Sequence, residues 1–391
     1  MNILDYLKWR GDLTFKQDPF NEIDNLIISQ MAYTVFDPYV KETDSYTVKE
    51  VSDMYFKDHT EQECKESKSF VGLAPLVLKG MAETTRFKDA IIHDFISNTD
   101  QATHQQFACF SINLSDKTTY IAFRGTDDTL VGWHEDLCLS YETVPAQISA
   151  VNYVNTHIKR GKKYRIGGHS KGGNLAIYSV LSLKRNKNSI INIYSNDGPG
   201  LHLQYLTEDQ KKTLAYFEPK IIKIVPEFDI FGILFSRIKN TKVIRSDGFT
   251  VMQHSAMTWL VEGKEFIPGT LSDLSITLKA SLDSFLETMS QEECHFFCDE
   301  VFKELDEAGI QNITDFTDGG ISVFIKALVR LSKLSNSNKQ IAKQLLLVFV
   351  NSSKSDLLIK VSDLKSSVKQ NALDLFNAAK AAIEDSEKKE G

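Results

Sequence analysis

The sequence lacks the excess of positive charge that a general nucleic-acid binder needs. Its 391 residues include 45 Lys and Arg against 52 Asp and Glu, which gives a formal net charge of −7. Binding to a phosphate backbone requires a basic face that neutralises the phosphates. We therefore expect no nucleic-acid partner.

Proline, glycine and long apolar runs are also scarce. Eight Pro and 20 Gly exclude collagen-like and proline-rich fibres. The most apolar late segment, QLLLVFV at residues 344–350, is too short to span a bilayer. The first residues, MNILDYLKWRGD, carry acids and lack the apolar core and cleavage site of a signal peptide. We expect a soluble protein of the cytoplasm.

Cysteine is too sparse and too scattered for a disulfide framework, because the five Cys are odd in number. Cys294, His295 and Cys298 superficially suggest half of a metal site. A zinc site needs four ligands, and no second Cys/His pair follows at ligand spacing. We interpret these residues as helix packing and expect neither a metal nor an organic cofactor.

The remaining composition is that of a globular protein, with 42% hydrophobic and 25% charged residues. The length allows one large domain or two modest ones. Residues 107–126 hold two strand-like runs around a polar turn. Further strands are predicted at 164–168, 191–195 and 220–225, and helices at 149–163, 170–185 and 206–214. This alternation predicts an α/β fold with a mostly parallel sheet flanked by helices.

The two ends of the chain differ in their hydrophobic patterns. Ile23, Leu26, Ile27 and Met31 lie at helical spacing, and residues 73–95 also look helical. Residues 40–70 are polar and charge-rich and suggest a loop or insertion, whereas 241–246 and 249–253 suggest a pair of edge strands. From residue 268 only helical patterns remain. We therefore expect a hydrolase-type domain at 1–267, with a mostly helical N-terminal part, and a helical appendage at 268–391.

The segment richest in chemical information is YRIGGHSKGGNLAIYS at residues 164–179. Its GHSKG stretch matches G-x-S-x-G between a short apolar strand and a helix, the context that gives this pattern meaning. The chain must turn sharply there and hold Ser170 in a strained conformation, with small residues two places before and after it. A plain glycine-rich turn is the structural alternative. We predict Ser170 as a nucleophile.

A serine nucleophile needs a histidine base and an orienting acid, in the order Ser, acid, His for this fold. His202 and His295 are poorly placed, so His254 is the candidate base. Asp229 and Asp197 both follow predicted strands, and Asp247 is better explained as a turn residue. We favour Asp229 and keep Asp197 as the reserve acid.

The oxyanion of an acyl-transfer intermediate needs two main-chain N–H donors. One belongs to the residue after the nucleophile, Lys171. The other is expected from Thr126, in the loop after the predicted strand that ends in AFRGT. A plain turn that caps a helix is the structural alternative for this loop.

Three segments together resemble the class 3 lipases, a branch of the α/β-hydrolase fold: AFRGT followed by WHEDL at Trp133–Leu137, then GHSKGG, then PEFDIFG with a His shortly before a Trp, here His254 and Trp259. The resemblance covers about residues 105–265. It implies Ser170 as nucleophile, Asp229 as acid, His254 as base, and Thr126 and Lys171 as oxyanion donors.

The chain also departs from the family pattern. Lys171 stands where the family usually has Leu, and the acid loop lacks the V-P-[RHK]-L-P ending. Both ends of the chain resemble an uncharacterised bacterial family of lipase-like proteins that carry a domain of unknown function.

We therefore expect a serine hydrolase that cleaves carboxylic esters, with a small-molecule or lipid ester as its partner. An acyltransferase, thioesterase or amidase with the same triad is an alternative. A further alternative is a catalytically silent binding scaffold with a hydrolase fold, whose sequence would be expected to lack a triad residue, whereas all three are present here. In the segment FDIFGILF, apolar residues flank Asp229. We give equal weight to two interpretations of them: an acyl pocket or peripheral membrane contact, and simple burial in the core. The helical regions at 70–100 and after 268 would act as a lid or cover the sheet. The sequence carries no signal for an oligomeric state.

Overall fold

The computed structural model describes most of the chain up to residue 276. The described residues are 1–67, 69, 71–100, 102, 105–127, 130–139, 142–229, 232, 238–248, 250–273, 275, 276, 279, 280, 295 and 299. One compact unit comprises Met1–Asp127, Val131–Gly248 and Met252–Ser275. The helical appendage predicted for 268–391 lies almost wholly outside the described residues, so the domain division stays a prediction.

Within the described residues, eight strands form one sheet in the order β1 to β8. The pairs from β1 to β4 are antiparallel, and the pairs from β4 to β8 are parallel. The strands are β1 (Ser45–Thr47), β2 (Ile91–Asp100), β3 (Gln105–Asn113), β4 (Thr118–Phe123), β5 (Lys163–His169), β6 (Ile190–Asn196), β7 (Ile221–Pro226) and β8 (Thr241–Ile244). The predicted α/β-hydrolase-like fold with a mostly parallel sheet is confirmed.

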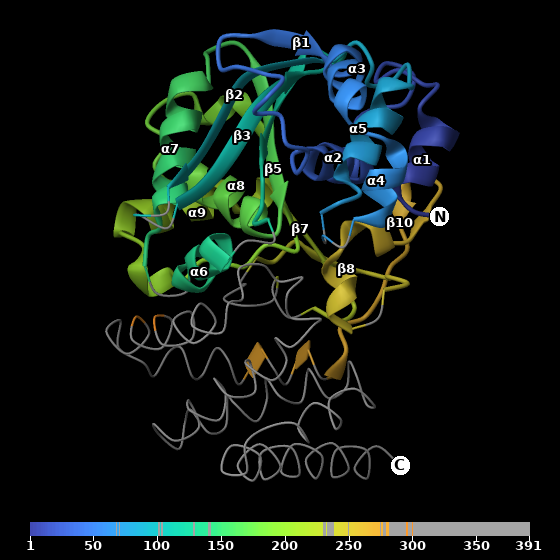
Figure 1. Cartoon of the computed structure of the whole chain (residues 1–391). Helices are drawn as coiled ribbons and strands as arrows, with labels where there is room; N and C mark the ends of the chain where they lie inside the picture. Colours follow the sequence, from blue (N-terminus) through green and yellow to red (C-terminus); the bar gives the residue numbers. More distant parts are fainter. Residues whose placement is uncertain are drawn as a thin grey trace, which may run out of the picture. The chain divides into compact units, whose positions relative to one another are not determined.

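Helices cover both faces of this sheet, with α7, α8 and α9 on one side and α1 to α5 on the other (Figure 1). A short pair, β9 (Val261–Glu262) and β10 (Glu265–Phe266), follows the sheet. The helices are α1 (Ile3–Arg10), α2 (Glu22–Met31), α3 (Val48–Asp58), α4 (Glu61–Glu66), α5 (Ala74–Ala82), α6 (Leu130–Cys138), α7 (Pro145–His157), α8 (Lys171–Leu181) and α9 (Glu208–Phe217). Among the described residues, none of these combines the length and apolar composition needed to cross a bilayer.

The parallel half of the sheet determines where a site can form. Because β4, β5, β6 and β7 run in the same direction, their carboxyl ends share one edge. The segments that leave this edge begin at Arg124, Ser170, Asp197 and Glu227. The predicted nucleophile, both candidate acids and the predicted oxyanion loop therefore leave the sheet at the same edge.

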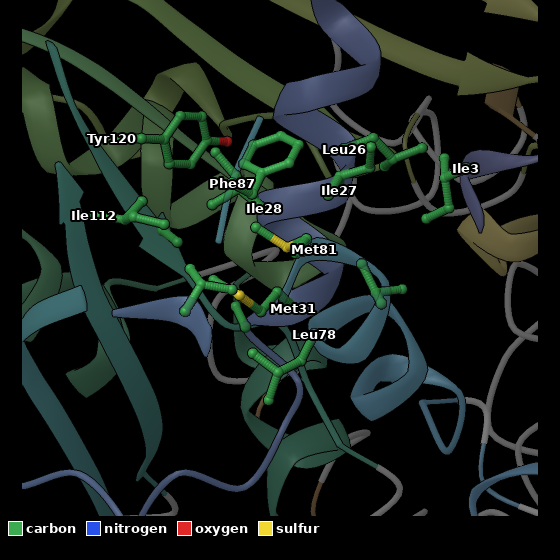
Figure 2. Close-up of a cluster of buried hydrophobic side chains, with 14 of the residues drawn as sticks. Ile3, Leu26, Ile27, Ile28, Met31, Leu78, Met81, Phe87, Ile112 and Tyr120 are labelled. Atoms are coloured by element: carbon green, nitrogen blue, oxygen red, sulfur yellow. The ribbon is translucent and has the colours of Figure 1, made fainter. Parts of the chain in front are cut away.

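A hydrophobic core between the sheet and the N-terminal helices fixes that edge. Side chains of α2 and α5 meet strand residues such as Ile112 and Tyr120 in one buried cluster (Figure 2). The helical spacing of Ile23, Leu26, Ile27 and Met31 is confirmed, because all four are fully buried in this core. Burying such a side chain contributes about 1.5–3 kcal/mol, so α2 is held firmly against the sheet.

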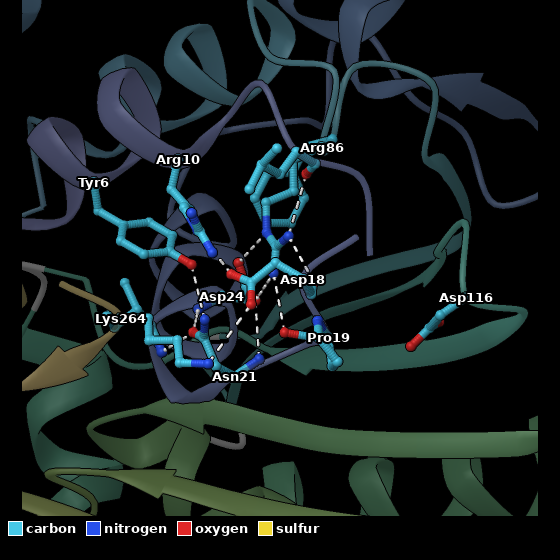
Figure 3. Close-up of polar contacts among 12 residues, drawn as sticks. Tyr6, Arg10, Asp18, Pro19, Asn21, Asp24, Arg86, Asp116 and Lys264 are labelled. Atoms are coloured by element: carbon cyan, nitrogen blue, oxygen red, sulfur yellow. Dashed lines mark hydrogen bonds and ion pairs between the residues drawn. The ribbon is translucent and has the colours of Figure 1, made fainter. Parts of the chain in front are cut away.

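A buried ion pair crosses the same region. The Arg86 guanidinium contacts both carboxylate oxygens of Asp24 on α2, at 2.7 and 2.5 Å. Its other N–H groups donate to the main-chain oxygens of Leu13, Asp18 and Pro19. Neither side chain of the pair is exposed to solvent. Figure 3 shows how Arg86 joins the loop before α2 to the turn after α5.

Three sequence predictions differ from the structure. The polar composition of residues 40–70 predicts a loop or an insertion, but this segment contains β1, α3 and α4, because capping boxes at Thr47 and Thr60 start both helices. The helical pattern at 73–95 stops at Ala82, and a strand rich in β-branched residues begins at Ile91. The segment Thr250–His254 is a 3-10 helix rather than an edge strand, and β8 pairs with β7 instead.

Candidate active site

Ser170 lies at the sharp turn between β5 and α8. Its backbone has φ 56° and ψ −131°, which is strained for a residue with a side chain. The Ser170 N–H donates to Asn196 O on β6 at 2.9 Å, and Gly173 N–H donates to Ser170 O at 2.9 Å. This conformation is typical of a nucleophile elbow, which presents the serine hydroxyl above the edge of a sheet.

The glycines on either side of Ser170 are required by crowding. A Cβ at Gly168 would lie 2.5 Å from Phe123 O, and a Cβ at Gly172 would collide with the same carbonyl. The elbow is therefore wedged against the end of β4, as the small residues in the motif predict.

His254 is held beside this elbow through two contacts. Its main-chain oxygen accepts a hydrogen bond of 2.8 Å from His169 Nε2, on the residue before Ser170. Its side-chain Nδ1 lies 2.7 Å from Asp197 Oδ2 at the end of β6. Because a carboxylate can only accept, Nδ1 carries the proton and Nε2 is the basic ring nitrogen.

The acid that contacts His254 is Asp197, the reserve candidate, and not Asp229. Asp229, the preferred acid, is a neighbour of Asp197, because Asp197 Oδ1 and Asp229 Oδ2 both lie close to Gly232. Both are buried, with Asp197 1% and Asp229 0% exposed. The structure thus brings Ser170, His254 and both acids to one edge of the sheet, and the direct contact to His254 Nδ1 is made by Asp197.

Burial controls the protonation of this His–Asp pair. It lowers the pKa of His254 to about 4. It raises the pKa of Asp197 to about 7, while the neighbouring Asp229 carboxyl and the Lys223 charge pull it down. At neutral pH the imidazole is therefore uncharged and able to accept a proton, as a general base must be.

His169 is a supporting residue that sequence reasoning missed. Its Nε2 faces a carbonyl and must carry the ring proton, so Nδ1 is unprotonated; it lies 3.0 Å from the Tyr33 hydroxyl, which also donates to His169 O at 3.1 Å. Burial lowers the pKa of His169 well below its ordinary value, which keeps the ring neutral. The chain from Tyr33 through His169 to His254 links the base to the elbow without adding a charge.

Polar residues of α2 and the turn after it also support the edge. Asn25 Nδ2 donates to Asn196 Oδ1 at 2.8 Å, and the Ser29 hydroxyl contacts that of Tyr120 at 3.1 Å. Asn25, Ser29 and Tyr33 are spaced four residues apart and therefore share one side. This polar stripe within an otherwise apolar pattern is the sequence signal that would have indicated contacts to the site.

The two predicted oxyanion donors lie next to the elbow. Lys171 is the first residue of α8, where the main-chain N–H has no partner within the helix. The Thr126 hydroxyl donates to Asp136 Oδ2 at 2.6 Å, so its single proton is engaged. Burial raises the pKa of Asp136 to about 6, which leaves this carboxyl mostly ionised at neutral pH. The Thr126 amide is thus the donor that this residue can offer.

The Lys171 side chain does not place an uncompensated cation at the site. Its ammonium is fully buried, 2.8 Å from Glu135 Oε2 and 3.0 Å from Gln106 O. The Glu135 carboxylate also accepts from the amides of Gln106 and Ala146. This ion pair, which the sequence analysis did not foresee, joins α6 to the start of α8.

Two sets of predicted features lie largely outside the described residues. Within FDIFGILF, only Phe228, Asp229 and Gly232 are described, so the acyl-pocket, membrane and burial interpretations stay predictions. Cys294 and Cys298 are likewise outside. The thiols of Cys64, Cys109 and Cys138 are buried.

Comparison with known proteins gives one family. A family model described as Mbeg1-like matches residues 81–303, which include the elbow, both acids and His254. No curated protein matches the chain.

Proposed function

Since the chain belongs to the Mbeg1-like family, which is lipase-like, we propose that it is a serine hydrolase that cleaves carboxylic esters through an acyl-enzyme. The observation that carries this proposal is the contact of His254 Nδ1 with Asp197 Oδ2 at 2.7 Å, beside the strained turn at Ser170. A nucleophile, a base and an orienting acid in this relation are the parts that acyl transfer needs.

In the proposed reaction, Ser170 Oγ attacks the ester carbonyl carbon while His254 Nε2 takes the hydroxyl proton. The Asp197 carboxylate stabilises the imidazolium that forms. The oxyanion receives hydrogen bonds from the Thr126 and Lys171 amides, and each such donor contributes about 10²–10³-fold to the rate. His254 then gives its proton to the departing alcohol. Water, deprotonated by His254, releases the acid and restores Ser170.

Hydrolysis of chromogenic p-nitrophenyl esters of increasing acyl length tests this proposal. We expect a burst of p-nitrophenol equal to the enzyme concentration, followed by slower turnover as the acyl-enzyme hydrolyses. A rate that rises with chain length would support the narrower proposal of a lipid ester, and a short-chain preference would support a simple esterase. A folded protein that releases no p-nitrophenol from any ester would contradict the proposed function.

The pH dependence of the same reaction follows from the protonation of Asp197. Catalysis needs this carboxylate ionised and His254 neutral. Because burial raises the pKa of Asp197 to about 7 and lowers that of His254 to about 4, kcat/KM is expected to rise with pH through about 7. Thermal unfolding followed over the same pH range separates this titration from loss of structure. Full activity at about pH 5, where only an ordinary carboxyl would be ionised, would contradict the assignment.

A further inference from the structure

Behind the His–Asp pair lies a second carboxyl group with no role in the reaction proposed above. Asp229 is fully buried, and its Oδ1 accepts a hydrogen bond of 2.7 Å from the Gly232 N–H. Asp197 Oδ2 is likewise engaged, by His254. The remaining oxygens, Asp197 Oδ1 and Asp229 Oδ2, are both buried and bond to no other group in the described part of the chain.

These two remaining oxygens face the same point. A Cβ at Gly232 would overlap Asp197 Oδ1 and lie 2.8 Å from Asp229 Oδ2, so the two oxygens converge beside this glycine. If both groups were ionised, two buried oxygens would face each other with no hydrogen between them, because a carboxylate oxygen only accepts. Two buried charges of the same sign are unfavourable, and one proton shared by Asp197 and Asp229 relieves this.

The surroundings decide which acid carries it. Asp197 receives the ring N–H of His254, which becomes an imidazolium in the proposed reaction and favours a charged Asp197, whereas Asp229 Oδ1 receives the neutral main-chain N–H of Gly232. Lys223 on β7 is buried beside the pair and donates to Gly198 O, and its charge favours ionisation of both acids. Burial and the neighbouring Asp197 charge raise the pKa of Asp229 well above its ordinary value. The shared proton therefore resides on Asp229.

We propose that Asp229 is a positioning residue, a neutral carboxylic acid that donates a hydrogen bond to Asp197 and so holds the Asp197 carboxylate toward His254. This inference rests on the proposed function for its kinetic consequences. Its physical content, a protonated Asp229, does not depend on catalysis. Asp229 contacts neither the substrate nor the reacting atoms, and it acts through Asp197 alone.

Three variants separate this role from that of a triad acid. Asp197→Asn removes the carboxylate from His254 and is expected to lower kcat by about 10⁴-fold. Asp229→Asn keeps a donor in a side chain of the same shape, because its amide N–H replaces the carboxyl O–H. Its kcat is expected to fall by no more than about tenfold. Asp229→Ala removes the donor and is expected to lower kcat by about 10–100-fold, with KM little changed.

The pH profile distinguishes positioning from a purely structural role. Asp229→Asn leaves the net charge unchanged if Asp229 is neutral, so the acid limb of kcat/KM should keep its midpoint. Asp229→Ala removes a bond that favours ionised Asp197, so the midpoint should move to higher pH. If the kcat of Asp229→Asn falls as far as that of Asp197→Asn, or the midpoint of its acid limb drops by about one pH unit or more, Asp229 is an ionised acid and the inference is overturned. An Asp229→Ala variant with unchanged kcat and unchanged midpoint would also overturn it.

Infrared difference spectroscopy tests the protonation without any turnover. The C=O stretch of a protonated carboxylic acid should persist in the wild-type protein at about pH 9, above the pKa of about 7 for Asp197 and about 6 for Asp136, and disappear in Asp229→Asn. Absence of that band in the wild type would contradict the inference even if ester hydrolysis is observed. Presence of the band in a protein that hydrolyses no ester would support it while the proposed function fails.

Discussion

Replacing Ser170 with Ala is expected to lower kcat for ester hydrolysis by about 10⁶-fold, with His254→Ala equally damaging, because the members of a triad act as a unit. The fold should be unaffected, since alanine at position 170 keeps the same backbone and neither side chain belongs to the core. The measurement is kcat for a p-nitrophenyl ester, with thermal unfolding as the check on folding.

Ser182→Ala is the matched control. Ser182 lies at the other end of α8, where its hydroxyl accepts a hydrogen bond from Gln210. This variant should keep wild-type turnover. Retention of full activity by Ser170→Ala, or by His254→Ala, would show that the chemistry takes place elsewhere.

Replacing Arg86 with Met is expected to lower the free energy of unfolding by about 3–5 kcal/mol, because it leaves the buried Asp24 carboxylate without its partner. The same change leaves the main-chain oxygens of Leu13, Asp18 and Pro19 without the donors that Arg86 supplies. The measurement is equilibrium unfolding in urea, compared at the midpoint and with the slope checked for two-state behaviour.

Two further variants test the cause of that loss. Arg10→Met removes a cation of the same cluster, but Arg10 is partly exposed and contacts Asp18 near solvent, so its effect should be much smaller. The double variant Arg86→Met with Asp24→Leu removes both charges of this pair, and much of the stability should return. A loss below about 1 kcal/mol in Arg86→Met would show that the pair contributes no more than a surface ion pair.

The nucleophile turn was predictable because its signal is local. Ser170, Gly168 and Gly172 lie within five residues of each other, and the strand before and the helix after them can be recognised from their own patterns. The predicted fold followed from the same kind of signal, the alternation of short apolar strands with helices.

The acid was harder to predict because its choice depends on tertiary contacts. Asp197 and Asp229 follow neighbouring parallel strands, β6 and β7, and each satisfies the spacing expected of a triad acid. Which one reaches His254 depends on the course of the segment 250–259. There the buried Trp259 donates to Gln253 O, and the Gln253 side chain accepts from Phe228 N. None of these contacts is visible in a single sequence.

The Lys171–Glu135 pair was missed for a similar reason. A lysine after the nucleophile places a cation beside the site, and only the position of α6 beside α8 makes it a buried partner of Glu135.

Helices α3 and α4 were missed because the polar composition of 40–70 is typical of a loop or an insertion. Thr47 with Glu50 and Thr60 with Glu63 form the capping boxes that start these helices.

The most direct test of the central claim, that Ser170 is an activated nucleophile, is reaction with a fluorophosphonate probe followed by mass spectrometry of the modified peptide. The probe reports an activated serine without presupposing the substrate. We expect one modified serine, Ser170, in the wild-type protein and in Ser182→Ala, with labelling lost in His254→Ala and strongly slowed in Asp197→Asn. Folded protein that is not labelled at Ser170, or is labelled equally well without His254, would contradict the account.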